Sequence, residues 1–321
     1  MSSTSNLSTD ITALIQEYYD RRALLERGFD SGLLKYAKPA NIPRNQSKVA
    51  HWHRWQKFAL AETVTEAAEP ADPIQAAVDE VTATMEILSS RINIPQDGDD
   101  IRIDSLTKES YPKFTEQLER TANRKLITAL GTASTGATFR YCGGKNSFAD
   151  LAAGDVITSK DIQRAVGYLE QNGVPKINGS YVCLLNPWAK VDLLAGDSEF
   201  RDLLKTGSLD VLQKNNLDMW AGARIAGQDE PFRETLGGTE GTYSGSGSVG
   251  TVYIFGRESY GSTQLMGKTG LKPRFKVQDI TATGSVMTIG WRCYYAGAIL
   301  NRTWVVALKH VMSDASVTSV A

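Results

Sequence analysis

Three glycines near residue 250 have a spacing that can bind a dinucleotide. Gly245, Gly247 and Gly250 fit the pattern G-x-G-x-x-G, in which the glycines follow a strand and open a helix whose N-terminus faces a pyrophosphate. Here they lie in a Gly/Ser-rich tract, residues 237–250, and precede an apolar run at residues 251–255. That context predicts a loop leading into a strand, and a helix after Gly250 would be needed to support nucleotide binding.

A second glycine string and the histidines add little chemistry. Gly267-Lys268-Thr269 resembles the end of a phosphate-binding loop, but Ser262 stands where that motif needs glycine, so a turn is predicted. His51 and His53 lie two residues apart, which places both imidazoles on one side of a strand. This spacing offers half of a metal site, but with no further ligand nearby it is more typical of two half-buried strand side chains. His310 is the only other histidine, and no nucleophile-elbow string is present.

The cysteines do not complete a site either. They are scattered without metal-binding spacing: Cys142, Cys183 and Cys293. An odd number of separated cysteines is typical of reduced thiols rather than of a disulfide framework. The sequence therefore predicts no catalytic residue, no metal and no cofactor.

Composition sets broader limits on the class of protein. The chain has 321 residues, 41% of them hydrophobic, with 35 Lys and Arg against 36 Asp and Glu. Such a chain can bury a sizeable core, and its near-zero net charge gives no overall attraction to nucleic acid or to an anionic membrane. No run approaches the roughly 18–20 apolar residues of a membrane span, and the polar first ten residues lack a secretion signal. We expect a large cytosolic globular protein.

Charge is segregated along the first 80 residues. Residues 21–57 carry nine Lys and Arg against two Asp and Glu, whereas residues 61–80 carry six acids and no base. Two solvated faces are the ordinary interpretation. The sharper hypothesis is that the acidic segment projects from the body and docks on the basic segment of another subunit. Basic and aromatic residues alternate at residues 51–58, which also suits single-stranded nucleic acid, or a sheet surface facing another subunit.

Hydrophobic periodicity predicts the elements that surround these residues. A helix is expected over residues 10–26, and strands at 49–58, 82–87, 91–94 and 100–104 suggest a long two-stranded excursion. The clearest helix spans residues 113–130, because Phe114, Leu118, Leu126 and Leu130 share one face, which we expect to pack on a sheet.

The second half of the chain alternates helices and strands. Thr158 and Asp161 predict the start of a helix that ends at Gly173, and Asn186 precedes another helix. Strands are expected at residues 181–185, 251–255, 274–280, 285–295 and 303–309. The fold class is therefore α+β, with most strands late in the chain.

Several strings, in a fixed order, resemble one known family. They are residues 48–58 with 62–66, 141–147 (YCGGKNS), 158–182, Asn186-Pro187, 223–227 (ARIAG) and 290–301. This order is similar to that of the N-four-type major capsid proteins of tailed phages, which have the Hong Kong 97 capsid fold. The resemblance implies five segments: an N-terminal arm (1–46), an extended loop (47–104), a spine helix with peripheral domain (105–187), an axial domain (188–279), and return strands with a C-terminal tail (280–321).

The resemblance also implies a function. A major capsid protein self-assembles into pentamers and hexamers of an icosahedral shell around double-stranded DNA, and is not an enzyme. Expected partners are further copies of the chain, a portal, scaffolding or decoration proteins, and packaged DNA without sequence specificity, with no membrane. The expected location is the virion, after assembly in the host cytoplasm. An encapsulin-like compartment shares the fold and stays open as an alternative.

Charge and reach predict the contacts between subunits. An extended loop points its tip away from its own base, since ten extended residues reach about 33 Å. The nearest basic surface for the acidic tip is then expected on an adjacent subunit. The candidate contact residues are Arg44, Lys48 and Lys57 on the basic side, and Glu62, Glu66, Glu69 and Asp72 on the acidic side.

Overall fold

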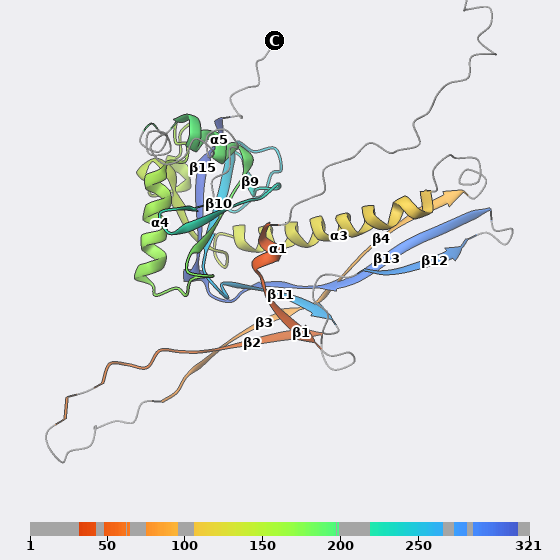
Figure 1. The fold of residues 1–321 in the computed structure, drawn as a ribbon, viewed down its shortest axis with the longest axis horizontal. Helices are drawn as coiled ribbons and strands as arrows, with labels where there is room; N and C mark the ends of the chain where they lie inside the picture. The colour runs from red at the N-terminus through yellow and green to blue at the C-terminus, as the bar shows by residue number, and fades with distance from the viewer. Residues whose placement is uncertain are drawn as a thin grey trace, which may run out of the picture.

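The structure, a computed structural model, describes residues 32–42, 48–61, 63–64, 75–95, 106–196, 198, 219–265, 273–280 and 285–313. Figure 1 shows three connected parts: a body built on a large sheet, a long helix lying along a smaller sheet, and a two-stranded excursion. The helix and the excursion extend from the body in different directions. The helix expected over residues 10–26 lies outside the described residues, as does the Gly267-Lys268-Thr269 string.

The body is built on a seven-stranded mixed sheet in the order β5-β15-β10-β6-β8-β7, with β9 paired to β10. Its strands are β5 (Thr138–Tyr141), β6 (Tyr181–Leu185), β7 (Met219–Trp220), β8 (Ala223–Gly227), β9 (Arg233–Glu234), β10 (Val249–Phe255) and β15 (Val305–Val311). Every residue of β6, β10 and β15 is buried. Three of the five segments expected from the sequence contribute strands to this one sheet.

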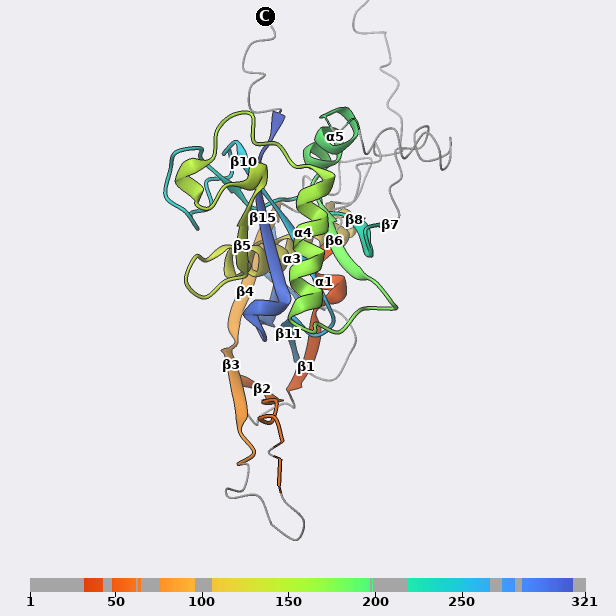
Figure 2. The same ribbon diagram turned by 90° about the vertical axis from the view of Figure 1, so that its left-hand side faces the viewer.

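Helices cover both faces of this sheet. One face packs on α4 (Ser159–Gln171) and α5 (Pro187–Gly196), and the other on α1 (Gly32–Tyr36) and the C-terminal half of α3 (Leu106–Gly131). In Figure 2 α4 lies in front of the sheet and α3 behind it. Because both faces are covered, the central strands are continuous apolar runs rather than alternating ones.

The helix starts on the first of these faces follow local sequence signals. The hydroxyl of Thr158 donates to the Asp161 carboxylate over 2.7 Å, and the amide of Thr158 donates to the same oxygen over 3.3 Å. At α5 the side-chain oxygen Oδ1 of Asn186 accepts from the backbone amide of Ala189 over 2.5 Å. Both predicted helix starts are confirmed, because capping depends on residues within one turn.

The long helix α3 connects the two sheets. It spans 26 residues, so the predicted helix at 113–130 is confirmed and begins earlier than expected. Phe114 and Leu118 are buried against the smaller sheet, whereas Leu126 and Leu130 are buried against the seven-stranded sheet. No helix within the described residues is long and apolar enough to cross a bilayer.

The smaller sheet lies under the N-terminal half of α3. It has the order β12-β13-β4 and consists of β4 (Glu86–Pro95), β12 (Arg274–Asp279) and β13 (Val286–Tyr295). The strands expected at 274–280 and 285–295 are confirmed. The expectation that residues 91–94 belong to the excursion is wrong, because β4 is one strand whose inward residues, such as Leu88 and Ile94, pack against α3.

The excursion itself is a hairpin of β2 (Val49–Trp55) and β3 (Val78–Thr84), paired antiparallel from Val49↔Thr84 to Trp55↔Val78. It ends at Met85, whose amide donates to the carbonyl of Lys48 over 2.8 Å. Beside its base lies a third sheet of β1 (Lys38–Ile42), β11 (Tyr260–Leu265) and β14 (Gly297–Ile299). None of these three strands was predicted, since each is short and weakly apolar.

Candidate assembly surfaces

The hairpin places alternate residues of β2 on opposite sides. Trp52 and Ala50 are buried in an apolar cluster with Ile42, Ala83 and neighbouring residues, which holds the base of the hairpin. His51 and His53 lie on the exposed side, as the spacing predicted. Within the described part of the chain, no group of three His, Cys, Asp or Glu side chains is arranged to hold a metal ion.

The outer part of the excursion exposes large apolar side chains. Trp55 is 69% exposed, Phe58 63% and Leu60 94%, and Val64 and Val78 are also exposed. A two-stranded ribbon has no core of its own to bury such groups. Exposed apolar groups gathered on one element are typical of a surface that another molecule covers.

Two acids of the hairpin have partners within it, one on each of its two sides. Asp79 accepts from Arg54 over 2.5 Å and from Gln56 over 2.5 Å, and Glu80 contacts His51. The hydrogen bond from Arg54 is the main cause that lowers the pKa of Asp79. Two of the six acids at residues 61–80 therefore have partners inside the hairpin.

The predicted contact residues are only partly visible. Lys48 and Lys57 are exposed, at the base of the hairpin and just beyond β2 respectively. The Lys57 ammonium lies beside Gly173, 3.5 Å from where a Cβ on that glycine would stand. The other five lie outside the described residues: Arg44, Glu62, Glu66, Glu69 and Asp72. The pairing of tip and arm stays a prediction.

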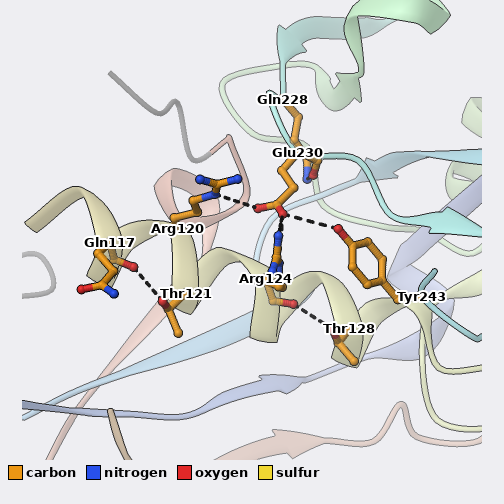
Figure 3. A network of polar contacts seen from close by, with 8 residues as sticks. All are labelled: Gln117, Arg120, Thr121, Arg124, Thr128, Gln228, Glu230 and Tyr243. Carbon is orange, nitrogen blue, oxygen red and sulfur yellow. Dashed lines mark hydrogen bonds and ion pairs between the residues drawn. The ribbon is translucent and has the colours of Figure 1, made fainter. Parts of the chain in front are cut away.

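A polar network ties α3 to the loop after β8 (Figure 3). Nε of Arg124 donates to Oε1 of Glu230 over 2.9 Å, and Nη2 of the same arginine contacts the same oxygen. The Tyr243 hydroxyl donates to Oε1 over 3.4 Å, and Nε of Arg120 lies 3.9 Å from Oε2. In the Arg124–Glu230 ion pair, Glu230 is shielded from solvent, with its side chain 13% exposed, whereas the Arg124 side chain is 50% exposed.

This network was not predicted from the sequence. Arg120 and Arg124 are four residues apart and so share one face of a helix, which is the only local signal. Glu230 lies 106 residues beyond Arg124, in a loop without any motif. The hydrogen bond to Glu230 is the main cause that raises the pKa of Arg124, which stays charged.

A second ion pair is fully buried in the large sheet. Nζ of Lys309 lies 2.5 Å from Oε2 of Glu234, both side chains are 0% exposed, and Nζ also lies 4.1 Å from the centre of the Phe139 ring. The amide of Gly241 donates to the other carboxylate oxygen over 2.7 Å. Burial raises the pKa of Glu234 and lowers that of Lys309. Because no solvent reaches the pair, removal of either side chain would leave the other charge buried and without its partner.

His310, the neighbouring residue, is also buried. Nδ2 of Asn186 lies 3.2 Å from Nε2 of His310, and Nδ1 lies 3.3 Å from the carbonyl of Val311. Burial lowers the pKa of His310 to about 4, so its ring is neutral at pH 7. Its described partners are an amide and a carbonyl, which gives no nucleophile for it to activate.

The glycine string does not form a nucleotide site. Val249 and Gly250 already belong to β10, so a strand and not a helix follows the glycines, which overturns the dinucleotide-binding alternative. A Cβ on Gly250 would stand 2.9 Å from Nδ2 of Asn186 and 3.0 Å from Nε2 of His310. Position 250 therefore has no room for a side chain, because Asn186 and the buried His310 pack directly against the backbone there.

Comparisons with known proteins show the fold. No family model and no curated protein matches the sequence. Among solved structures, the capsid of Ralstonia phage GP4 is 14% identical, with 97% of this chain and 98% of that chain covered and a TM-score of 0.70. The cyanophage Pam1 capsid asymmetric unit is 11% identical, with 98% and 100% covered and a TM-score of 0.74. The capsid of cyanophage P-SCSP1u is 16% identical, with 95% and 96% covered and a TM-score of 0.67.

The chain thus has the Hong Kong 97-like fold of phage capsid proteins, as the resemblance implied, and the α+β class that its pattern of elements predicted. The match runs nearly end to end in both directions, so the excursion and the long helix are part of the shared fold. The narrower N-four-type family stays a prediction.

Proposed function

We propose that this chain is a major capsid protein, which self-assembles into an icosahedral shell enclosing double-stranded DNA. The observation that carries the proposal is the near-complete coverage of this chain and of phage capsid chains in both directions. The exposed apolar residues of the hairpin support it, because they need a covering surface that the chain's own body does not provide. The role is structural and requires no catalytic group.

The partners follow from this role. Each subunit contacts further copies in five- and six-membered rings, and such contacts are heterologous ones that close. A portal, scaffolding or decoration proteins and DNA bound without sequence specificity complete the list. The location is the virion, after assembly in the host cytoplasm. The division into arm, extended loop, spine, axial domain and return strands belongs to the same proposal.

The contact between acidic tip and basic arm is part of the proposal as well. Lys48 and Lys57 are exposed, as such a contact needs. Individual exposed ion pairs are worth only about 0–1 kcal/mol, so apolar hairpin residues such as Trp55 and Phe58 must supply much of the stability of the shell.

Electron microscopy of the purified full-length protein tests this function. Closed shells with five- and six-membered rings are the expected result, and nuclease-resistant DNA inside shells purified from infected cells separates a capsid from an empty compartment. A protein that stays monomeric at every concentration and salt, while its circular dichroism shows a folded chain, would contradict the proposal. Binding of single-stranded oligonucleotides by such a monomer would favour the nucleic-acid-binding alternative.

A further inference from the structure

One edge of the seven-stranded sheet is open. The sheet ends at β5, which pairs in parallel with β15 from Val306↔Thr138 to Lys309↔Tyr141, and no other described strand pairs with β5. An edge strand has backbone N–H and C=O groups on its free side, which can pair with the backbone of another extended chain. None of the four residues of β5 is fully buried, whereas every residue of β6, β10 and β15 is.

A cleft of about 590 Å³ lies between β5 and α4. All four residues of β5 line one side of it, and a stripe of α4 that includes Arg164 and Tyr168 lines the other. Residues 144–146, which follow the strand, line the cleft as well. Figure 2 shows α4 in front of the sheet that β5 borders. The cleft thus runs beside the whole length of the strand that has the free edge.

Positive charge predominates in this cleft. Its lining contains three cations, Arg140, Lys145 and Arg164, and one carboxylate, Asp161. Asp161 is only 5% exposed, and its Oδ2 already accepts from the Thr158 hydroxyl at the start of α4. Nη1 of Arg164 lies 3.8 Å from the other oxygen of Asp161, yet the Arg164 side chain is 70% exposed. One buried carboxylate therefore leaves the cleft with a net positive charge.

The two other cations can also take a further partner. Nζ of Lys145 lies 3.8 Å from Oδ2 of Asp155, and that oxygen also accepts from the amide of Ala152 over 2.7 Å. The Arg140 guanidinium lies over the Tyr168 ring, 4.6 Å from its centre, and within the described residues it forms no ion pair. A guanidinium stacked on a ring keeps the N–H groups in its plane available to a carboxylate.

Protection of the edge alone does not explain this arrangement. A charged side chain on an edge strand can prevent unwanted pairing, and Arg140 alone could serve that purpose. However, Arg140 is turned toward Tyr168 on α4. Lys145 and Arg164 line the same cleft from other elements, which protection of the edge does not require. A free strand edge with cations beside it is instead suited to an extended acidic peptide.

We propose that β5 and the cleft beside it bind an extended acidic segment of a partner protein, which pairs with the free edge of β5 as an additional strand. Main-chain hydrogen bonds supply affinity in this mode of recognition, and side-chain contacts supply specificity. Alternate side chains of the added strand point to the α4 side of the sheet, where Asp or Glu meets Arg140 and Arg164. Four residues of β5 give a paired region of about 13 Å.

Charge and backbone chemistry together select this occupant. Duplex DNA is anionic but has no peptide N–H and C=O groups to pair with a strand edge, so a polypeptide fits both features of the site. The site is separate from the contact between the acidic tip and the basic arm, and it does not depend on shell formation.

Two designed peptides test the site on full-length, unassembled subunits. In one labelled peptide Asp alternates with Val, in the other Lys alternates with Val, and fluorescence anisotropy measures binding. We expect salt-dependent binding of the acidic peptide only. The cleft-reversed variant, Arg140→Glu with Arg164→Glu, should bind it about tenfold or more weakly, because two attractive charge contacts become repulsive. This variant should bind the Lys peptide instead.

A matched control keeps the change in net charge but leaves the cleft intact. Lys160→Glu with Arg257→Glu alters two exposed residues outside the cleft and should bind the acidic peptide normally. Circular dichroism confirms that each variant is folded. Equal binding of the acidic peptide to unaltered and cleft-reversed subunits contradicts the site. No binding of that peptide to unaltered subunits, or binding of a duplex oligonucleotide in its place, overturns the proposal.

Hydrogen exchange locates the pairing. The acidic peptide should slow exchange of the amides of residues 138–141 and leave those of β7, at the other end of the sheet order, unchanged. Binding without protection of β5 contradicts strand addition.

The shell-forming role is tested separately. Peptide binding by subunits that never form shells supports the docking site while contradicting the proposed function, and normal shells without peptide binding contradict the docking site alone. The cleft-reversed variant should assemble like the unaltered chain, because the occupant is a different protein. A folded cleft-reversed variant that no longer assembles would assign the cleft to a second copy of this chain and overturn the proposal.

Discussion

Asn186 holds His310 in a defined neutral tautomer. The side-chain Oδ1 of Asn186 accepts from the backbone amide of Ala189, which fixes the side-chain amide so that its Nδ2 faces Nε2 of His310 over 3.2 Å. Nε2 must then accept, and the proton sits on Nδ1, 3.3 Å from the carbonyl of Val311. The contact joins the start of α5 to the last strand of the large sheet, so protonation of one buried ring disturbs both.

This histidine makes the fold acid-sensitive. Its pKa falls from 6.5 to about 4 on folding, so the unfolded chain binds the proton more readily. Stability from the neutral ring is fully present above pH 6.5 and is lost as the pH falls from 6.5 toward 4, by about 3 kcal/mol. Urea unfolding of unassembled His310→Gln subunits should show a weaker pH dependence than the unaltered chain in this window. The exposed His53→Gln change is the control, and an equal effect of both would contradict the assignment.

Leu118 is the critical contact between α3 and the smaller sheet. Its side chain is fully buried beside Phe114 and Trp291. Leu118→Asp places an unpaired charge in that cluster, so we expect it to abolish folding or assembly. Thr128→Asp puts the same group on an exposed position of the same helix and should leave a folded protein. Normal shells from Leu118→Asp would mean that this helix face is not part of the scaffold.

The Arg124–Glu230 pair should couple α3 to the loop after β8. A double-mutant cycle with Arg124→Gln and Glu230→Gln is expected to give a coupling free energy of about 0.5–1 kcal/mol, because Glu230 is shielded while Arg124 is half exposed. Urea unfolding measures it. The same cycle with Arg120, whose Nε is 3.9 Å from the carboxylate, should give a smaller value. Equal coupling free energies would show that both arginines act on Glu230 through long-range electrostatics and that the Arg124 hydrogen bond adds nothing.

Gly250 should not tolerate a methyl group. A Cβ there approaches Asn186 and His310 to 3.0 Å or less in a fully buried strand, so Gly250→Ala is expected to destabilise the chain by about 1–3 kcal/mol. Gly167 lies within α4 with nothing near its missing Cβ, so Gly167→Ala should stabilise by about 0.5–1 kcal/mol. Thermal unfolding of both variants provides the comparison. A neutral Gly250→Ala would mean that the neighbouring side chains move aside.

Sequence reasoning succeeded where the signal is local. Leu118 and Leu126 lie on one face of α3 through simple helical spacing, and Thr158 caps α4 through a residue three positions away. The parallel pairing of β1 with β11 joins residues more than 200 positions apart, and neither strand has an apolar pattern that marks it. The Arg124–Glu230 contact is likewise created by tertiary packing between segments 106 residues apart. The acidic and basic segments are visible in the sequence, but which surfaces meet is a property of the assembled molecules.

The position of β15 also determines when, during synthesis of the chain, the seven-stranded sheet can be completed. This strand lies between β5 and β10 although it is the last of the seven in chain order, so its place stays empty until Val311 has left the ribosome. A partial chain has two open strand edges facing the gap, and such long-range pairings form slowly. The excursion, synthesised more than 200 residues earlier, has no finished body to hold it in that interval. A chain that is still being synthesised therefore lacks the finished seven-stranded sheet on which the rest of the fold packs.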